Sequence, residues 1–342
     1  MRIMLSIALI AGCVYGAFAQ EKELLVDKPG TFKITYGTLN GQGPDQYGNS
    51  CGYTKAESDA ATKILVSLVD IFRRYPVLKD NKGFDGYCYL NGGRCSTKFG
   101  YGLPSSVCFF FEPWSLRKGK VVKQTSEPPQ WRLEVNMTEK FCSNAFNVSN
   151  YNNEGRPSNP TYKAEEMDKA ATQLRELFFL PGEKEEVSPG IDRYGDNIIL
   201  FNPDQPEYWN QVKIGEVFRL LINYYKLHPD KIAMETMVPM LENEFSNFTE
   251  TEKDGFAYFG NPESISRIVS TKNATPVMRP NPDYWKRKLP RSAIQFMWLE
   301  IPPKEIVKSK MKDRLKRQDG YYYVSRLLDE LDVKDLLSVV SH

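Results

Sequence analysis

Histidine is scarce in this sequence: only His228 and His342 occur among its 342 residues. Zinc or iron sites built from several histidines are therefore excluded by count. His228 precedes Pro229, at the expected end of a helix, where capping that end is its simplest role. A Ser-His-Asp or Cys-His site could use only this one internal imidazole. Because no Gly-x-Ser-x-Gly motif accompanies it, the sequence does not favour nucleophilic catalysis.

Other motifs that would carry chemistry are also missing. The chain has no Gly-x-x-x-x-Gly-Lys loop and no strand-linked Gly-x-Gly-x-x-Gly, so no cradle for a nucleotide cofactor is visible. It has no Cys-x-x-Cys pair, which argues against a zinc ribbon or a thioredoxin-type site. The formal net charge is only +2, which gives no reason to expect a nucleic-acid partner. We expect no cofactor and no transition metal, while the many loop Asp and Asn residues leave calcium open.

The first residues have the order of an export signal. A short positive start is followed by an apolar core over 3–12 and by Ala17-Phe18-Ala19 before Gln20. We expect 1–19 to be a signal peptide and the protein to be secreted, periplasmic or in the cell envelope. Alternatively, Ile10-Ala11-Gly12-Cys13 resembles a lipobox, which would anchor the chain by a lipid on Cys13. No other run of about 18 apolar residues follows, so no transmembrane segment is expected after cleavage.

Export to an oxidising compartment gives the cysteines a role in disulfides. Five remain after the signal, which leaves one thiol over: Cys51, Cys88, Cys95, Cys108 and Cys142. Asn91-Gly92 favours a two-residue type I′ turn, which would place Cys88 opposite Cys95. Directly opposed strand residues lie about 4.5 to 5.5 Å apart, within disulfide reach. We therefore predict a Cys88–Cys95 disulfide, with Cys88–Cys108 across neighbouring strands as the alternative.

The range 20–142 is predicted to be an α+β domain that bears the disulfide. Thr54 and Glu57 form a capping box that opens an amphipathic helix, and Pro76 ends that helix. Strands are predicted at 84–90, 106–111 and 131–136. In the last of these, apolar and polar residues alternate, which is typical of a strand with one face in water. The expected architecture is an N-terminal helix packed on an antiparallel meander.

A second, helix-rich α+β domain is predicted over 161–342. Six asparagines and two prolines within 143–160 indicate a linker or a long surface loop before it. Apolar residues at helical spacing from Ile214 to Tyr225, and again from Met234 to Phe245, predict two helices joined by a corner at Pro229. Such an αα-hairpin needs a third surface, and we expect a sheet to supply it. Strands are predicted at 198–201 and 292–301, and a basic helix at 304–317.

One short sequence nearly repeats in the second half. Asn202-Pro-Asp-Gln-Pro-Glu-Tyr-Trp209 returns as Asn281-Pro-Asp-Tyr-Trp285, and each copy resembles a helix start. If the strands beside them share a sheet, the rings meet and form either an aromatic core cluster, which we favour, or a surface on which sugars stack. The candidate ligand-binding residues are Tyr208, Trp209, Tyr284, Trp285, Glu207 and Asp283.

These patterns favour an exported, non-catalytic binding protein with a glycan or protein partner. The alternative is a glycosidase-like hydrolase of polysaccharides, because such enzymes need only two carboxylates about 5 to 10 Å apart. Its candidate acids are Glu207, Glu216, Glu242, Asp283 and Glu300. An inhibitor-like interaction module is the third interpretation. If Glu207 and Asp283 converged in a cleft, the hydrolase would become the better interpretation.

Overall fold

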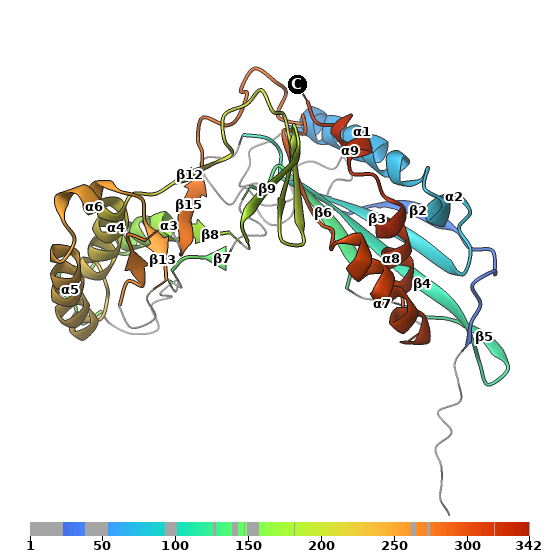
Figure 1. Ribbon diagram of the computed structural model, residues 1–342, viewed down its shortest axis with the longest axis horizontal. Helices are drawn as coiled ribbons and strands as arrows, with labels where there is room; N and C mark the ends of the chain where they lie inside the picture. Colours follow the sequence, from blue (N-terminus) through green and yellow to red (C-terminus); the bar gives the residue numbers. More distant parts are fainter. Residues whose placement is uncertain are drawn as a thin grey trace, which may run out of the picture.

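A computed structural model describes residues 23–37, 54–92, 101–125, 128–138, 143–146, 148, 157–180, 182–260, 265–271, 274–317 and 319–341. Within these ranges the fold is mixed α+β, and its strands are mostly antiparallel. Figure 1 shows two lobes: a large sheet with helices along one face, and a smaller lobe of helices and short strands.

The large sheet is assembled from both halves of the sequence. Its strand order is β2-β3-β4-β6-β16-β11-β10-β9, and β1 and β5 also pair with β4. Only β2 and β3 run parallel. The strands are β1 (Glu23–Leu24), β2 (Phe32–Tyr36), β3 (Phe84–Gly92), β4 (Ser105–Arg117), β5 (Lys120–Lys123), β6 (Trp131–Val135), β9 (Lys184–Ser188), β10 (Ile191–Tyr194), β11 (Asn197–Phe201) and β16 (Phe296–Glu300).

The position of β16 does not agree with the predicted division into domains. β16 lies between β6, with Leu299 opposite Leu133, and β11. The ranges 20–142 and 161–342 therefore share one sheet, and they also share one apolar core. Strand pairing between distant segments is invisible to local composition, which is why the Asn-rich stretch at 143–160 looked like a boundary. The strands predicted at 84–90, 106–111, 131–136 and 198–201 are present.

Helices cover one face of this sheet. They are α1 (Lys55–Phe72), α2 (Pro76–Lys79), α7 (Lys304–Arg317), α8 (Tyr321–Glu330) and α9 (Lys334–Leu337). The predicted capping box is present, because the Thr54 side chain accepts from the Glu57 amide while the Glu57 carboxylate accepts from the Thr54 amide. At the other end of α1, the Phe72 ring packs 5.1 Å from the Phe109 ring and 5.5 Å from the Trp131 ring. The N-terminal helix thus packs on the sheet as predicted.

The smaller lobe contains the predicted αα-hairpin. Its helices are α3 (Ala164–Arg175), α4 (Ile214–Lys226), α5 (Lys231–Ser246) and α6 (Glu250–Asp254). Its strands are β7 (Ser143–Asn144), β8 (Phe178–Phe179), β12 (Trp209–Gln211), β13 (Tyr258–Phe259), β14 (Ile268–Val269) and β15 (Thr275–Pro280). The buried stripe of α4 packs with α3 and with Val277 of β15 in one core. A sheet therefore does supply part of the third surface.

The predicted turn on which the Cys88–Cys95 disulfide depends is absent. Asn91 and Gly92 belong to β3 and pair with Ser106 and Ser105 of β4, so the chain does not reverse there. Cys88 is a buried free thiol, and Cys95 lies outside the described residues. The alternative partner, Cys108, lies directly opposite Tyr89, the next residue along β3. Since neighbouring residues of a strand point to opposite faces, Cys88 and Cys108 lie on different faces and cannot bond.

His228 lies at the corner between α4 and α5, as predicted. Its side chain is 4% exposed, its Nδ1 accepts from the Asp230 amide at 3.1 Å, and its ring stacks on Tyr225. Burial lowers the pKa of His228 below its usual 6.5. The unfolded chain therefore binds a proton at this residue before the folded chain does, as the pH falls.

We expect His228 to make the protein less stable in mild acid. Its contribution to the free energy of unfolding is complete above about pH 6.5 and is lost as the pH falls toward the lowered pKa. In that range the unfolded chain binds the proton more tightly than the folded chain. His228→Asn keeps an acceptor near the Nδ1 position but cannot be protonated. Urea unfolding at about pH 7.5 and about pH 5.5 measures the difference. An equal loss of stability in the parent and in His228→Asn would contradict the prediction.

Candidate binding pocket

The two Asn-Pro-Asp segments form matching turns and do not start helices. Asn202 Oδ1 accepts from the Asp204 amide at 2.9 Å, and Asn281 Oδ1 accepts from the Asp283 amide at 3.0 Å. This bond closes a turn by means of the asparagine side chain. Trp209 then enters β12, paired with Pro280 of β15, and α4 begins only at Ile214. The predicted helix starts at both segments are therefore wrong.

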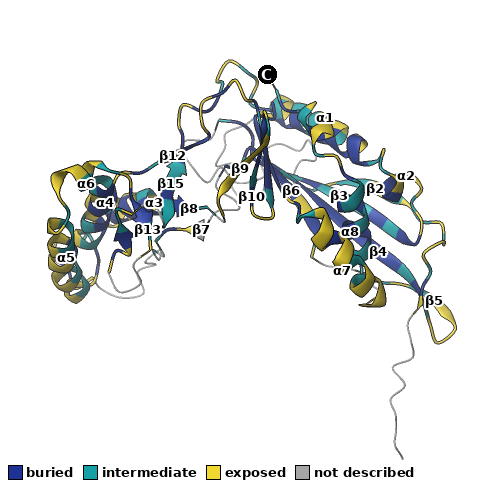
Figure 2. Cartoon of the chain, in the orientation of Figure 1, coloured by how far each residue is buried: buried dark blue, intermediate teal, exposed yellow. Residues whose placement is uncertain are grey.

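The repeated rings meet and are buried. Tyr208 is 1% exposed, Trp209 4%, Tyr284 0% and Trp285 5%, and the Tyr208 and Tyr284 ring centres lie 6.2 Å apart. These four residues, here named the aromatic cluster, pack against Ile199, Phe296 and Trp298 of the large sheet. Figure 2 shows the dark blue, buried strands at this junction between the lobes. The aromatic cluster is part of the core, and its rings are not available for stacking on a sugar.

Within the described residues, no hollow described here is lined by two of the acids proposed for a hydrolase. Glu207 and Asp283 are exposed, and Glu207 pairs with Lys184 at 3.1 Å. Glu216 binds Arg279 through both carboxylate oxygens, and Glu242 pairs with Lys226 at 2.9 Å. Glu300 lines a hollow of about 110 Å³ in which the described lining residues include no second acid. Among the described residues, neither Glu207 nor Asp283 lines any of these hollows.

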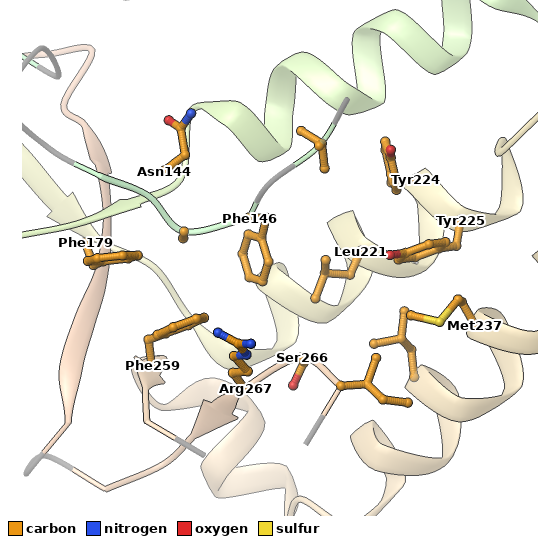
Figure 3. A pocket seen from close by; sticks show the side chains of 14 residues that line it. Asn144, Phe146, Phe179, Leu221, Tyr224, Tyr225, Met237, Phe259, Ser266 and Arg267 are labelled. Atoms are coloured by element: carbon orange, nitrogen blue, oxygen red, sulfur yellow. The ribbon is translucent and has the colours of Figure 1, made fainter. Parts of the chain in front are cut away.

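A larger hollow lies in the smaller lobe, between the α4–α5 hairpin and the short strands. Its volume is about 380 Å³. Five aromatic rings line it: Phe146, Phe179, Tyr224, Tyr225 and Phe259. Figure 3 shows these rings around the hollow, with Leu221 of α4 and Met237 of α5 closing one side. We name it the hairpin pocket.

The hairpin pocket exists because the two helices bury their stripes unequally. In α4 the stripe is largely buried, including Val217, Phe218 and Leu221. In α5 only Leu241 is buried, although the same spacing predicts a full stripe. Met237 is half-exposed and lines the pocket. The α5 stripe is thus apolar surface that the core does not cover completely.

One edge of the pocket is polar. The Glu244 carboxylate accepts from the Ser266 hydroxyl at 2.5 Å and from the Ser266 amide at 3.3 Å. The next residue, Arg267, has a φ of 57°, in the left-handed region that residues other than Gly, Asn and Asp seldom adopt. Its guanidinium lies over the Phe259 ring, 5.8 Å from the ring centre. The pocket therefore combines aromatic and aliphatic walls with polar groups and is cationic at one edge.

None of the pocket residues was among the candidates from the sequence. They come from β7, β8, α4, α5, β13 and the segment 265–267, which are far apart in the chain. Their apolar spacing on α4 and α5 indicated core packing and carried no sign of a hollow. No helix within the described ranges is long and apolar enough to span a membrane. Comparison with protein-family models, with curated proteins and with solved structures finds no match to this chain.

Proposed function

We propose that the chain is an exported, non-catalytic binding protein and that the hairpin pocket holds its ligand. The pocket itself carries the proposal: a hollow of about 380 Å³ lined by five aromatic rings, with polar groups from Asn144, Ser266 and Arg267. Ligand sites for small molecules have this composition and span about 300 to 1,000 Å³. Export rests on the pattern of 1–19, with a mature start at Gln20 or, alternatively, a lipid on Cys13. These residues lie outside the described ranges.

The lining of the pocket favours binding over catalysis. Ser266 is a hydroxyl at its edge, but it is 2% exposed and is bonded to the Glu244 carboxylate and to the Ile268 amide. A hydroxyl buried in this way is poorly placed to attack a ligand in the hollow. No histidine or cysteine is among the described residues that line the pocket. The burial of the aromatic cluster also removes the reason to place a glycan at Tyr208 or Trp285. A small apolar ligand fits the structure better than a polysaccharide.

Filling the hairpin pocket should abolish binding of an apolar probe. We expect the parent to bind the neutral dye N-phenyl-1-naphthylamine saturably, as read by its fluorescence. Met237→Trp places an indole where the dye would lie, and it should raise the Kd of the dye by about tenfold or more. The matched control is Met240→Trp, since Met240 is on the same helix, is 47% exposed and does not line the pocket.

The control variant should bind the dye as the parent does, and thermal unfolding should show both variants to be folded. Two results would refute the proposal: a parent that shows no saturable binding, or a folded Met237→Trp variant with the affinity of the parent.

A further inference from the structure

We infer that the ligand of the hairpin pocket is an organic anion, with an apolar or aromatic body and a carboxylate or sulfonate end that Arg267 binds. The inference rests on the proposed function, since it names the class of ligand for the same pocket. Arg267 is the only charged side chain among the described lining residues. The rings would enclose the body of the ligand, and the guanidinium would receive its charge.

The Arg267 guanidinium is held in place by stacked rings. It lies over the Phe259 ring, and the Phe259 ring stacks on the Phe179 ring at 5.4 Å with 15° between their planes. Figure 3 shows the guanidinium beside Phe259, on the side that faces Phe146. A guanidinium that lies over a ring can still present its N–H groups to a planar oxyanion, which they can bind as a fork.

The charge of Arg267 is not neutralised within the described chain. No carboxylate of the described residues forms an ion pair with it. Glu244, which contacts this segment, is bonded to the amide and hydroxyl of Ser266. An arginine beside aromatic rings that pairs with no acid of the described residues is complementary to an anionic ligand.

The backbone around Arg267 fixes the direction of its side chain. Ser266 is anchored on α5 through Glu244, and the Ser266 hydroxyl accepts from the Ile268 amide at 3.1 Å. The Arg267 carbonyl accepts from the Gly260 amide at 3.0 Å. These bonds on both sides hold Arg267 in its left-handed conformation, an arrangement that is found where a side chain must be placed for function.

Two dyes with the same body separate this inference from the proposed function. 8-Anilinonaphthalene-1-sulfonate carries a sulfonate on the frame of the neutral N-phenyl-1-naphthylamine. Arg267→Met should raise the Kd of the sulfonate about tenfold, or about 1.4 kcal/mol, and that of the neutral dye less than about threefold. Arg219→Met is the matched control, because Arg219 is exposed on α4 and does not line the pocket; it should change neither Kd.

A second variant covers a failure of Arg267→Met to fold. Arg267→Gly also removes the guanidinium, and glycine accepts the positive φ without strain. It should show the same selective loss of the sulfonate. If the parent binds both dyes and the Arg267 variants weaken both equally, the anion inference is wrong while the proposed function stands. If the parent binds neither dye, both fail.

Discussion

Trp209→Ala and Trp285→Ala should each lower the free energy of unfolding by about 3 to 5 kcal/mol. Both side chains are at least 95% buried in the aromatic cluster, which joins the large sheet to the smaller lobe. Trp209 also donates from its indole nitrogen to the Thr138 carbonyl at 2.8 Å. Its loss would therefore create a cavity and remove this buried hydrogen bond. Urea unfolding curves with an unchanged m-value measure the effect.

The matched control is an exposed ring in the same half of the chain. Phe256→Ala removes a side chain that is 49% exposed, and it should cost less than about 1 kcal/mol. If Trp209→Ala and Trp285→Ala were as stable as this control, the rings would not be core residues. The ring-lined surface for a sugar would then become the better interpretation of the repeat.

Replacing Lys184 with methionine should cost about 3 kcal/mol. Lys184 lies 3.1 Å from Asp192, whose carboxylate is 1% exposed. Asp192 accepts a bond of 2.6 Å from the Tyr208 hydroxyl, but its other oxygen, Oδ1, has no hydrogen-bond partner in the described structure. Without Lys184 the buried charge would keep only the Tyr208 bond. Burial opposes the charge of Lys184, but Glu207 and Asp192 raise its pKa above 10.5, so Lys184 stays charged at neutral pH.

Two further variants separate the two carboxylates that contact Lys184. Glu207 is also 3.1 Å from Lys184, but its side chain is 68% exposed. Water screens that pair, so Glu207→Gln should cost less than about 1 kcal/mol. The double variant Lys184→Met with Asp192→Asn removes the buried charge as well, and it should recover at least about 1 kcal/mol relative to Lys184→Met alone. A double variant no more stable than Lys184→Met would contradict this account.

Local patterns in the sequence predicted local structure well. The Thr54 capping box and the stripe of α4 each depend on neighbours within a few residues, and both are present. The prediction that one face of β6 lies in water is wrong, because Glu134 is 2% exposed and Asn136 5%. The turn predicted at Asn91-Gly92 is absent because both residues belong to β3 and pair with β4. The helix starts predicted at Asn202 and Asn281 are absent because these side chains close turns, and strand pairing follows the turns. In each failure a contact between distant segments outweighed a local preference.

The sequence singled out four residues of the core, and its candidate site residues include none that line the hairpin pocket. Tyr208, Trp209, Tyr284 and Trp285 were unusual enough to single out, and their meeting in one core cluster was the favoured interpretation. The hairpin pocket could not be predicted from the sequence, because a pocket forms where segments that are distant in the chain pack together incompletely. The spacing of Met237 and Tyr225 is the same whether the space beside these side chains is filled by other residues or left empty. No feature of the sequence indicated Arg267 as a binding residue, because its left-handed backbone conformation is known only from the structure.

The place of β16 in the middle of the large sheet has a consequence for how the chain folds. β6 and β16 are neighbours although about half of the chain separates them. Still later in the chain, Tyr323 of α8 is buried against Phe84, and its hydroxyl donates to the Gly83 carbonyl at 2.9 Å. Pairing of such distant segments slows folding, because a long loop must close first. The first strands therefore stay open during synthesis until β16 and α8 are available. Late completion of the sheet would suit the export proposed above, because the sheet cannot close before β16 and α8 have been made.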